Sequence, residues 1–325
     1  MDYKPIILEA LEVLRNKEAA SPFKARAYAK VIKGLREVPG PIRSYNDILT
    51  AGVPGIGKKI EEKIAEIIST GHLEAADVAR DDASALNALT SIYGIGPVKA
   101  QELLENGIRS VLDLRSALGE TPGILNDKQK IGLRYAEDLV LRIPRAEMDQ
   151  HAKLLKDGLG GLNGLDKIEI VGSYRRKAKD SGDIDVLLRP KKHALFSIGD
   201  VIASLNAKGY IIETLAEGVK KFMGICRIPM GPTNPVGPTN PVGRARRLDI
   251  LVTPREEYAY AVLYFTGSDK FNIEMRKKAL ELGYTMNEHG MQPLDPEKTA
   301  KPPIMKNEKD IFKFLNMEYV KPDKR

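Results

Sequence analysis

The spacing of apolar residues changes part-way along the chain, and this change restricts the folds that the chain can adopt. Up to about residue 158, apolar residues recur every three or four positions, as in amphipathic helices. Further along, alternating runs rich in β-branched residues predict strands at 167–172, 183–188, 221–228 and 247–252, with one helix at 198–208. Short helices with a small β portion follow from about residue 256. This separation predicts an α+β protein, a helical N-terminal half followed by a mixed sheet with helices on one face.

Glycine and proline divide the helical half into short helices. Pro39-Gly40-Pro41 breaks the pattern, and glycine pairs separate several later segments. A helix is predicted to end where Ile143 precedes Pro144, because the residue before proline disfavours helical backbone. After a first helix near residue 6, the predicted helices lie at about 24–36, 45–50, 58–70, 83–92, 97–106, 111–118 and 127–142.

Composition excludes several classes of protein. A chain of 325 residues, 42% apolar and 29% charged, is large enough for more than one domain with a core. No apolar run approaches about 20 residues, so no membrane span or membrane partner is expected. The single cysteine, Cys226, excludes an intrachain disulfide and a cysteine-rich zinc site, and indicates a reducing, intracellular setting in nucleus or cytoplasm. A net charge of +7 is compatible with a polyanionic partner.

Two glycine hairpins between short helices predict contact with nucleic acid. V-P-G-I-G-K-K-I at 53–60 and I-Y-G-I-G-P-V-K-A at 92–100 share one pattern. Paired glycines let the backbone approach a phosphate, and the next helix presents free N–H groups to it. This helix-hairpin-helix pattern holds the nucleic-acid backbone without reading sequence. The alternatives are a plain turn between helices, or a nucleotide-binding P-loop, which Lys59 argues against because Ser or Thr is required there. The predicted DNA-binding residues are Gly55, Gly57, Lys59, Gly94, Gly96 and Lys99.

Three aspartates form the second constellation. Asp183 and Asp185 stand at i and i+2 on a predicted strand, so both carboxylates leave the same face, and Asp249 lies on another strand. Three carboxylates around two Mg²⁺ ions are what in-line phosphoryl transfer requires, and Mn²⁺ can substitute. Upstream, Gly172-Ser173 would cradle a phosphate, with Arg176 as a clamp. The alternative is a strand with solvated acids.

A hexapeptide is repeated without change. Residues 231–236 read G-P-T-N-P-V, and 237–242 repeat them letter for letter. Two prolines in each copy cannot donate strand hydrogen bonds, so the segment 231–243 is predicted to be a loop between strands. Whether this loop affects dependence on a template is left open by the sequence.

Taken together, these motifs resemble the X family of DNA polymerases, most closely the compact DNA polymerase beta and lambda type. The resemblance rests on the hairpins, G-S-Y-R-R…G-D-I-D, K-F-M-G-I-C, R-R-L-D-I, Y-F-T-G-S and E-K-D-I-F. It implies a lyase-like helical domain at 1–79, a helical duplex-binding domain at 80–144, a nucleotidyltransferase palm at 145–255 and a small α+β domain at 256–325 that binds the nascent base pair.

The resemblance also implies a function and its residues. The function is gap-filling nucleotidyl transfer in base-excision repair by a two-metal mechanism, with deoxynucleoside triphosphates and gapped or nicked duplex DNA as partners of a monomer. Asp183, Asp185 and Asp249 would bind Mg²⁺, and Arg276 would reach the template. The incoming nucleotide would meet Arg142, Gly172, Ser173, Arg176, Gly182, Tyr264, Phe265, Gly267, Asp269 and Asn272. Backbone groups of the hairpins would bind Na⁺ or K⁺ at Val53, Ile56, Thr90, Ile92 and Ile95.

Departures from the family pattern leave two questions open. Lys63 matches the Schiff-base lysine of a 5′-deoxyribose phosphate lyase, but Ala51 and Ala75 replace phosphate-binding lysines of polymerase beta. Leu251 replaces an arginine that interacts with a catalytic aspartate there, so how domain closure is controlled is left open by the sequence. The alternatives to gap filling are a template-independent terminal transferase or end-joining polymerase, and a non-catalytic helix-hairpin-helix scaffold.

Overall fold

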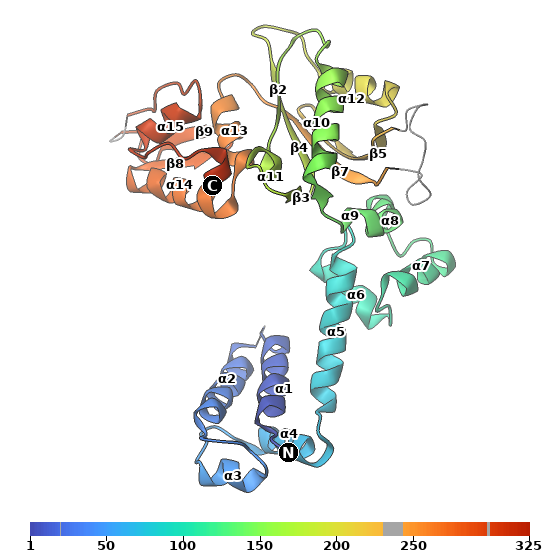
Figure 1. Ribbon diagram of the computed structural model, residues 1–325, viewed down its shortest axis with the longest axis vertical. Helices are drawn as coiled ribbons and strands as arrows, with labels where there is room; N and C mark the ends of the chain where they lie inside the picture. Colours follow the sequence, from blue (N-terminus) through green and yellow to red (C-terminus); the bar gives the residue numbers. More distant parts are fainter. Residues whose placement is uncertain (20, 230–242, 298–299) are drawn as a thin grey trace. The chain divides into compact units, whose positions relative to one another are not determined.

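The computed structural model describes residues 1–19, 21–229, 243–297 and 300–325. It divides into two compact units, residues 1–129 and 130–325 (Figure 1). The repeated hexapeptide at 231–242 lies outside the described residues. No helix among those described is both long and apolar enough to cross a bilayer.

The first unit is helical throughout. Its first helices pack through a core that includes Ile7, Leu11, Leu35, Ile64 and Ile67. The helix ends follow local chemistry: Ser44 and Asp47 form a capping box at the start of α3, and Gly71 adopts φ +85° where α4 ends. The helices are α1 Lys4–Lys17, α2 Pro22–Glu37, α3 Tyr45–Thr50, α4 Lys58–Thr70, α5 Glu74–Thr90, α6 Pro97–Glu105 and α7 Val111–Glu120, with α8 Asp127–Arg134 crossing into the second unit.

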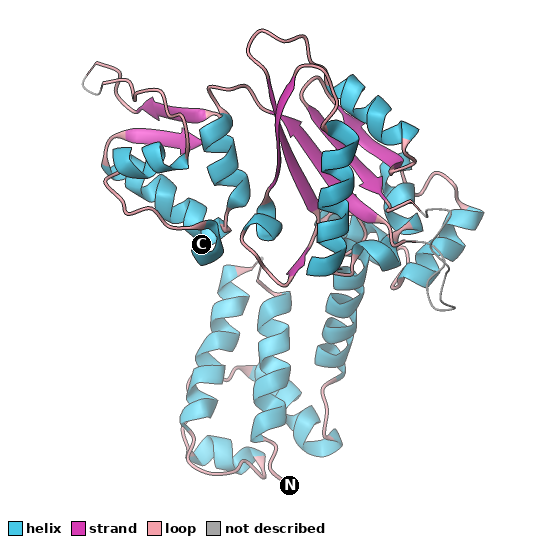
Figure 2. Ribbon diagram, turned by 45° about the horizontal axis from the view of Figure 1, so that its top comes forward, coloured by secondary structure: helices cyan, strands magenta, loops and turns pink. Residues whose placement is uncertain are grey.

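The second unit is built on a mixed five-stranded sheet (Figure 2). The strand order is β2-β4-β7-β6-β5, and only β4 and β7 run parallel. The strands are β2 Leu165–Ile170, β4 Ile184–Pro190, β5 Ile211–Glu217, β6 Lys221–Cys226 and β7 Arg246–Val252. A separate short antiparallel pair consists of β1 Ile143–Pro144 and β3 Asp180–Ser181. It joins the segment that precedes α10 to the segment that precedes β4.

Alternation along β4 assigns the two faces of the sheet. Ile184, Val186 and Leu188 join the main core, together with residues of α10 (Arg145–Leu159) and α12 (Ile198–Ala207). Leu187 instead packs with α13 (Tyr258–Thr266) on the opposite face. Asp185 has the parity of Leu187 and therefore leaves the sheet on the α13 side.

The C-terminal part is a small α+β assembly. Phe271, Met275, Ile311 and Phe312 form its core. It contains α14 Asp269–Glu281, β8 Tyr284–Asn287, β9 Gly290–Pro293, α15 Glu308–Phe314 and a 3₁₀ turn at Pro322–Lys324. The α+β prediction, with a helical first part and a mixed sheet, is confirmed. The expectation of helices on one face of the sheet is wrong, because α10 and α12 cover one face and α13 packs on the other.

Several predicted elements need correction. The expected helix over 127–142 is wrong: α8 ends at Arg134, and a short α9 (Ala136–Leu139) follows. Tertiary contacts explain the break, because the side chains of Arg134 and Tyr135 both reach Glu213. The expected helix at 83–92 begins earlier, at Glu74, so the predicted domain boundary at 79/80 falls inside α5. Prediction missed α10 and β5, neither of which has a strong local start signal.

Candidate active site

Strand pairing places two of the predicted acids side by side. Asp185 on β4 and Asp249 on β7 are direct partners in the parallel register. Asp183 was expected on the strand, but it lies just before β4 begins at Ile184. All three carboxylates nonetheless interact electrostatically, because each of the other two raises the pKa of Asp185. We call Asp183, Asp185 and Asp249 the acidic site.

The acidic site carries more negative charge than its surroundings balance. Burial, with repulsion from Asp183 and Asp249, raises the pKa of Asp185 to about 7. Burial also raises the pKa of Asp249. One cation approaches closely: Nη2 of Arg247 donates to Oδ2 of Asp183 at 3.1 Å and lies 3.5 Å from Oδ2 of Asp249. Oδ1 of Asp249 is buried and accepts no hydrogen bond from the described residues.

The donor set fits hard divalent cations. Carboxylate oxygens are the ligands that Mg²⁺ prefers, and the unpartnered Asp249 oxygen is available to one. As they stand, no three His, Cys, Asp or Glu side chains in the described part of the chain are close enough to hold one ion together. Asp183 is turned toward Arg247. Metal binding by all three acids therefore requires Asp183 to exchange Arg247 for the ion.

A cleft of about 660 Å³ opens beside the acidic site and brings most of the predicted residues together. It is lined by every residue predicted to contact the nucleotide: Arg142, Gly172, Ser173, Arg176, Gly182, Tyr264, Phe265, Gly267, Asp269 and Asn272. Asp183, Asp185 and Arg276 also line it, whereas Asp249 borders a second cavity of about 280 Å³ that shares Asp185. Residues far apart in sequence thus form one site.

Two glycines allow close approaches in this cleft. Gly172 has φ +60°, and a Cβ atom there would lie 2.6 Å from Oδ2 of Asp185. At Gly182 a Cβ atom would lie 2.9 Å from Nη1 of Arg142, whose Nε donates to Asp180 at 2.8 Å. Ser173 donates to Ser181 at 2.8 Å. Any side chain at these glycines would push the acidic site and the guanidinium of Arg142 away from the cleft.

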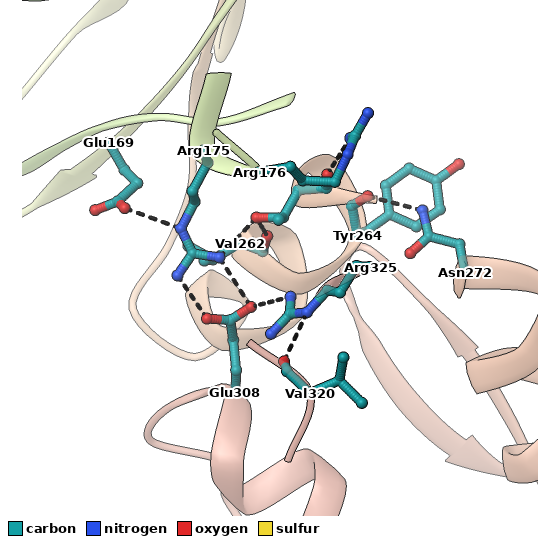
Figure 3. A network of polar contacts seen from close by, with 10 residues as sticks. Glu169, Arg175, Arg176, Val262, Tyr264, Asn272, Glu308, Val320 and Arg325 are labelled. Carbon is teal, nitrogen blue, oxygen red and sulfur yellow. Dashed lines mark hydrogen bonds and ion pairs between the residues drawn. The ribbon is translucent and has the colours of Figure 1, made fainter. Parts of the chain in front are cut away.

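The segment after Gly172 is fastened to the C-terminal part (Figure 3). Arg175 donates to both oxygens of Glu308, at 3.0 and 2.6 Å, and Arg325 donates to the same carboxylate at 2.6 Å. Burial alone would raise the pKa of Glu308, but these two guanidinium groups lower it. Nη1 of Arg176 donates to the carbonyl of Thr266 at 2.5 Å. The phosphate-cradle segment is therefore held to Glu308, at the start of α15, by an ion pair, and to α13 by the hydrogen bond from Arg176.

One face of α14 completes the cleft. Asp269, Asn272, Ile273 and Arg276 follow the i, i+3, i+4, i+7 pattern and all line it. Nδ2 of Asn272 donates to the carbonyl of Tyr264 at 2.8 Å. Sequence reasoning missed Ile273, Ser181, Arg247, Glu308 and Arg325. For Ile273 the helical spacing from Asp269 and Arg276 was an available signal, whereas the others depend on contacts between distant segments.

In the first unit, both hairpins have the expected backbone. Gly55 and Gly94 adopt φ +89° and +85°, and Gly57 and Gly96 are the N-caps of α4 and α6, with no side chain capping either helix. All four glycines are exposed. The N–H of Ile60 donates to the carbonyl of Gly57 and Pro97 has no N–H, so the first-turn N–H groups left for an anion are those of Lys58, Lys59, Val98 and Lys99.

The remaining predicted residues of the first unit lie around the hairpins. Lys59 is exposed, and Lys99 pairs with Glu102 at 2.7 Å. Lys63 is half-buried on α4, one turn after Lys59. The predicted cation-binding residues are buried or half-buried near the hairpins: Val53, Ile56, Thr90, Ile92 and Ile95. The carbonyl of Ile92 already accepts a hydrogen bond from the N–H of Ile95.

Comparison with known proteins yields four successive family matches. They are a helix-hairpin-helix domain over residues 2–73, the fingers domain of DNA polymerase lambda over 87–140, the DNA polymerase beta palm over 142–255 and the DNA polymerase beta thumb over 261–325. DNA polymerase lambda from Rattus norvegicus is 31% identical over 100% of this chain. The chain belongs to the X family of DNA polymerases.

Other X-family relatives are more distant. DNA polymerase lambda from Arabidopsis thaliana is 27% identical over 92% of the chain, and human DNA-directed DNA/RNA polymerase mu is 25% identical over 98%. The chain spans 56% and 57% of the length of the two lambda relatives and 68% of the mu relative. The acidic site and the cradle after Gly172 lie in the palm match, and α14 lies in the thumb match.

Proposed function

We propose that this chain is a DNA-directed DNA polymerase that fills gaps in duplex DNA during base-excision repair. One observation supports this most directly: the cleft beside the acidic site is lined by a phosphate cradle on one side and by α13 and α14 on the other. A nucleoside triphosphate needs these groups, because its phosphates require cations and N–H donors while its sugar and base require a flat, partly apolar wall.

We assign roles by position in the cleft. Asp183 and Asp185 would hold both ions, and Asp249 would hold the ion next to the primer terminus. When bound, two Mg²⁺ ions, or Mn²⁺ in their place, lower the pKa of the primer 3′-hydroxyl and neutralise charge on the triphosphate. Ser173, Arg176 and Arg142 would bind the triphosphate, with Gly172 and Gly182 admitting it. Tyr264, Phe265, Gly267, Asp269 and Asn272 would contact the sugar and base.

DNA would be held by backbone contacts. The hairpin N–H groups at Gly55, Gly57, Gly94 and Gly96 would bind phosphates, helped by Lys59, Lys99 and a bound Na⁺ or K⁺, while Arg276 would reach the template strand. Such binding is insensitive to sequence and falls steeply as salt rises. An affinity that stays constant from low to physiological salt would contradict this part of the proposal.

Primer extension on three substrates tests the activity. The substrates are a one-nucleotide gap with a 5′-phosphate, an open primer-template and a lone single strand, each with Mg²⁺ and all four deoxynucleoside triphosphates. We expect fastest extension on the gap and none on the single strand. Extension of the single strand would place the chain with template-independent transferases, and absence of extension on all three would leave the scaffold alternative.

A lyase reaction is a second candidate, favoured by the half-buried position of Lys63 on α4 next to the first hairpin. A lysine shielded from water is the type of group that forms Schiff bases. Borohydride reduction in the presence of DNA with a 5′-deoxyribose phosphate should then give a covalent adduct, and Lys63→Ala should remove it. A Lys59→Ala variant is the control for loss of DNA binding. An adduct of equal yield in Lys63→Ala would assign the reaction elsewhere.

A further inference from the structure

Arg246 is the largest fully buried side chain among the described residues, with 2% of its surface exposed. It stands at the first position of β7, directly before Arg247. Its guanidinium donates to both oxygens of Glu147, at 2.7 and 2.9 Å, and to the backbone carbonyls of Asp138 and Leu141, at 3.3 and 2.9 Å. We call Arg246 with these partners the Arg246 clamp.

The two carbonyls belong to a segment that the nucleotide cleft depends on. Asp138 lies in the last turn of α9, Leu141 follows that helix, and the next residue, Arg142, lines the cleft. A second bond fastens the same segment, because the N–H of Ala245 donates to Oδ2 of Asp138 at 2.8 Å. At the other end of the clamp, β7 continues to Asp249. The buried guanidinium of Arg246 therefore joins the segment before Arg142 to the strand that carries Asp249.

The charge in this cluster is balanced. Burial alone would raise the pKa of Glu147, but its interactions with His151 and with the guanidinium of Arg246 lower it to about 2. The ion pair is thus formed at any physiological pH. A lysine has one charged point instead of a planar fork, so it cannot reach a carboxylate and two carbonyls in the same geometry.

We propose that Arg246 is a positioning residue for nucleotidyl transfer, which sets the placement of Arg142 relative to Asp249 without itself lining the cleft. This proposal rests on the polymerase function proposed above. Losing the clamp would let the 138–142 segment move, and small displacements of groups that bind a reacting phosphate slow the reaction disproportionately.

A neighbouring pair in the same core supplies a matched control. Nδ1 of His151 lies 2.8 Å from the hydroxyl of Tyr210, and both residues are fully buried. This pair borders Glu147, at 3.7 Å from Nε2 of His151. No bond among those described links Tyr210 to Asp138 or Leu141. Tyr210→Phe therefore damages the core without touching the carbonyls.

The test compares Arg246→Met, Arg246→Lys and Tyr210→Phe with the parent on gapped DNA. We expect Arg246→Met to raise KM for the deoxynucleoside triphosphate and to lower kcat, each by about tenfold, and Arg246→Lys to recover part of both losses. Tyr210→Phe should lower Tm and leave both constants within about twofold. Amide hydrogen exchange at residues 139–142 should quicken in Arg246→Met and stay at the parent rate in Tyr210→Phe.

The outcomes separate the two proposals. An inactive parent would refute the polymerase function, whereas an active parent with unchanged constants and exchange in folded Arg246→Met would refute positioning by Arg246. Equal kinetic losses in Tyr210→Phe would show a general effect of core damage and would also refute it. If Arg246→Met does not fold, Arg246→Lys decides, because it keeps the buried charge but loses the planar fork that reaches the carboxylate and both carbonyls: a parent-like KM and exchange rate there would overturn the proposal.

Discussion

Two clusters of charged side chains meet on strand β7, and they balance their charge in opposite ways. In the Arg246 clamp, the Glu147 carboxylate receives a bidentate pair, and its pKa falls to about 2. In the acidic site, Asp185 faces two other carboxylates, and its pKa rises to about 7. Arg246 and Asp249 are close in sequence on the same strand. The charge balance around each of them is set by the side chains that neighbouring elements place against it.

This difference separates a structural role from a functional one. A buried carboxylate that is fully paired with a guanidinium has no charge left for a ligand, and such a pair can keep two elements of the fold together. A group of carboxylates with too few cations is unstable by itself, and the deficit is removed when a cation binds. The acidic site therefore destabilises the cation-free fold and favours cation binding, whereas the Arg246 clamp stabilises the fold and positions the segment before Arg142.

The largest expected effect is on catalysis. Asp249→Asn removes a negative charge that the cations need, so we expect nucleotide incorporation to fall by at least about a thousandfold. Affinity for gapped DNA should stay within about threefold, because the hairpins lie elsewhere. Single-turnover extension and gel-shift titration measure the two quantities.

The control for this change is Glu256→Gln, which converts an exposed carboxylate shortly after β7 to an amide. It should behave as the parent does in both assays. Incorporation by Asp249→Asn within a few-fold of the parent rate would remove Asp249 from the mechanism.

The next effect is on stability. Glu147→Gln leaves the buried guanidinium of Arg246 without its counter-charge, so we expect the free energy of unfolding to fall by about 3 kcal/mol. Urea unfolding at pH 7 measures this loss. Glu256→Gln, at an exposed glutamate after β7, is the control for replacing a glutamate by an amide. A loss no larger than that of the control would mean that the clamp contributes little to the fold.

A smaller effect on the free energy of unfolding is expected from the acidic site, where the pKa of Asp185 is raised and that of Glu147 in the clamp is lowered. With the folded-state pKa of Asp185 near 7 and an ordinary value near 3.8, the folded protein retains a proton between these values that the unfolded chain has lost. Stability of the metal-free protein should therefore fall as pH rises from 5 to 7, by about 2 kcal/mol, and level off above that.

Asp185→Asn isolates this contribution. Unfolding in EDTA at several pH values should show a shallower fall in the variant than in the parent, because the amide does not titrate. Addition of Mg²⁺ at pH 8 should stabilise the parent more than the variant. Identical pH dependence in the two proteins would show that the charge of the acidic site is balanced after all.

The smallest effect is expected away from both clusters. Deleting residues 237–242 removes one copy of the hexapeptide repeat and leaves the other copy to connect β6 and β7. Gap filling by the deletion variant should match that of the parent on gapped DNA. A large loss would show that activity depends on this segment as well as on the clusters along β7, and a parental activity on single strands that disappears with the deletion would favour a terminal transferase.

Local patterns in the sequence determined a large part of this protein. Glycine pairs predicted both hairpins because only a few residues can turn the backbone so tightly, and alternation predicted four of the five central strands, since side chains on a strand alternate between faces. The same alternation predicted that Asp185 shares one face of its strand with the residues two positions away. Gly172, Ser173 and Arg176 were identified from a short, continuous motif of phosphate recognition, whereas most of the other cleft residues were identified only through the resemblance to the X family.

Only the tertiary structure decided which distant groups meet. Nothing near Arg246 in the sequence indicates Glu147 or the carbonyls at 138 and 141, and nothing near Arg175 indicates Glu308 and Arg325. The break between α8 and α9 follows from contacts with Glu213, and β5 is defined by its pairing with β6. A local pattern fixes the direction in which a side chain points. The partner of a buried charge depends instead on how separate elements pack. Burial makes an unpaired charge costly, so a counter-charge is required even when it lies far away in the chain.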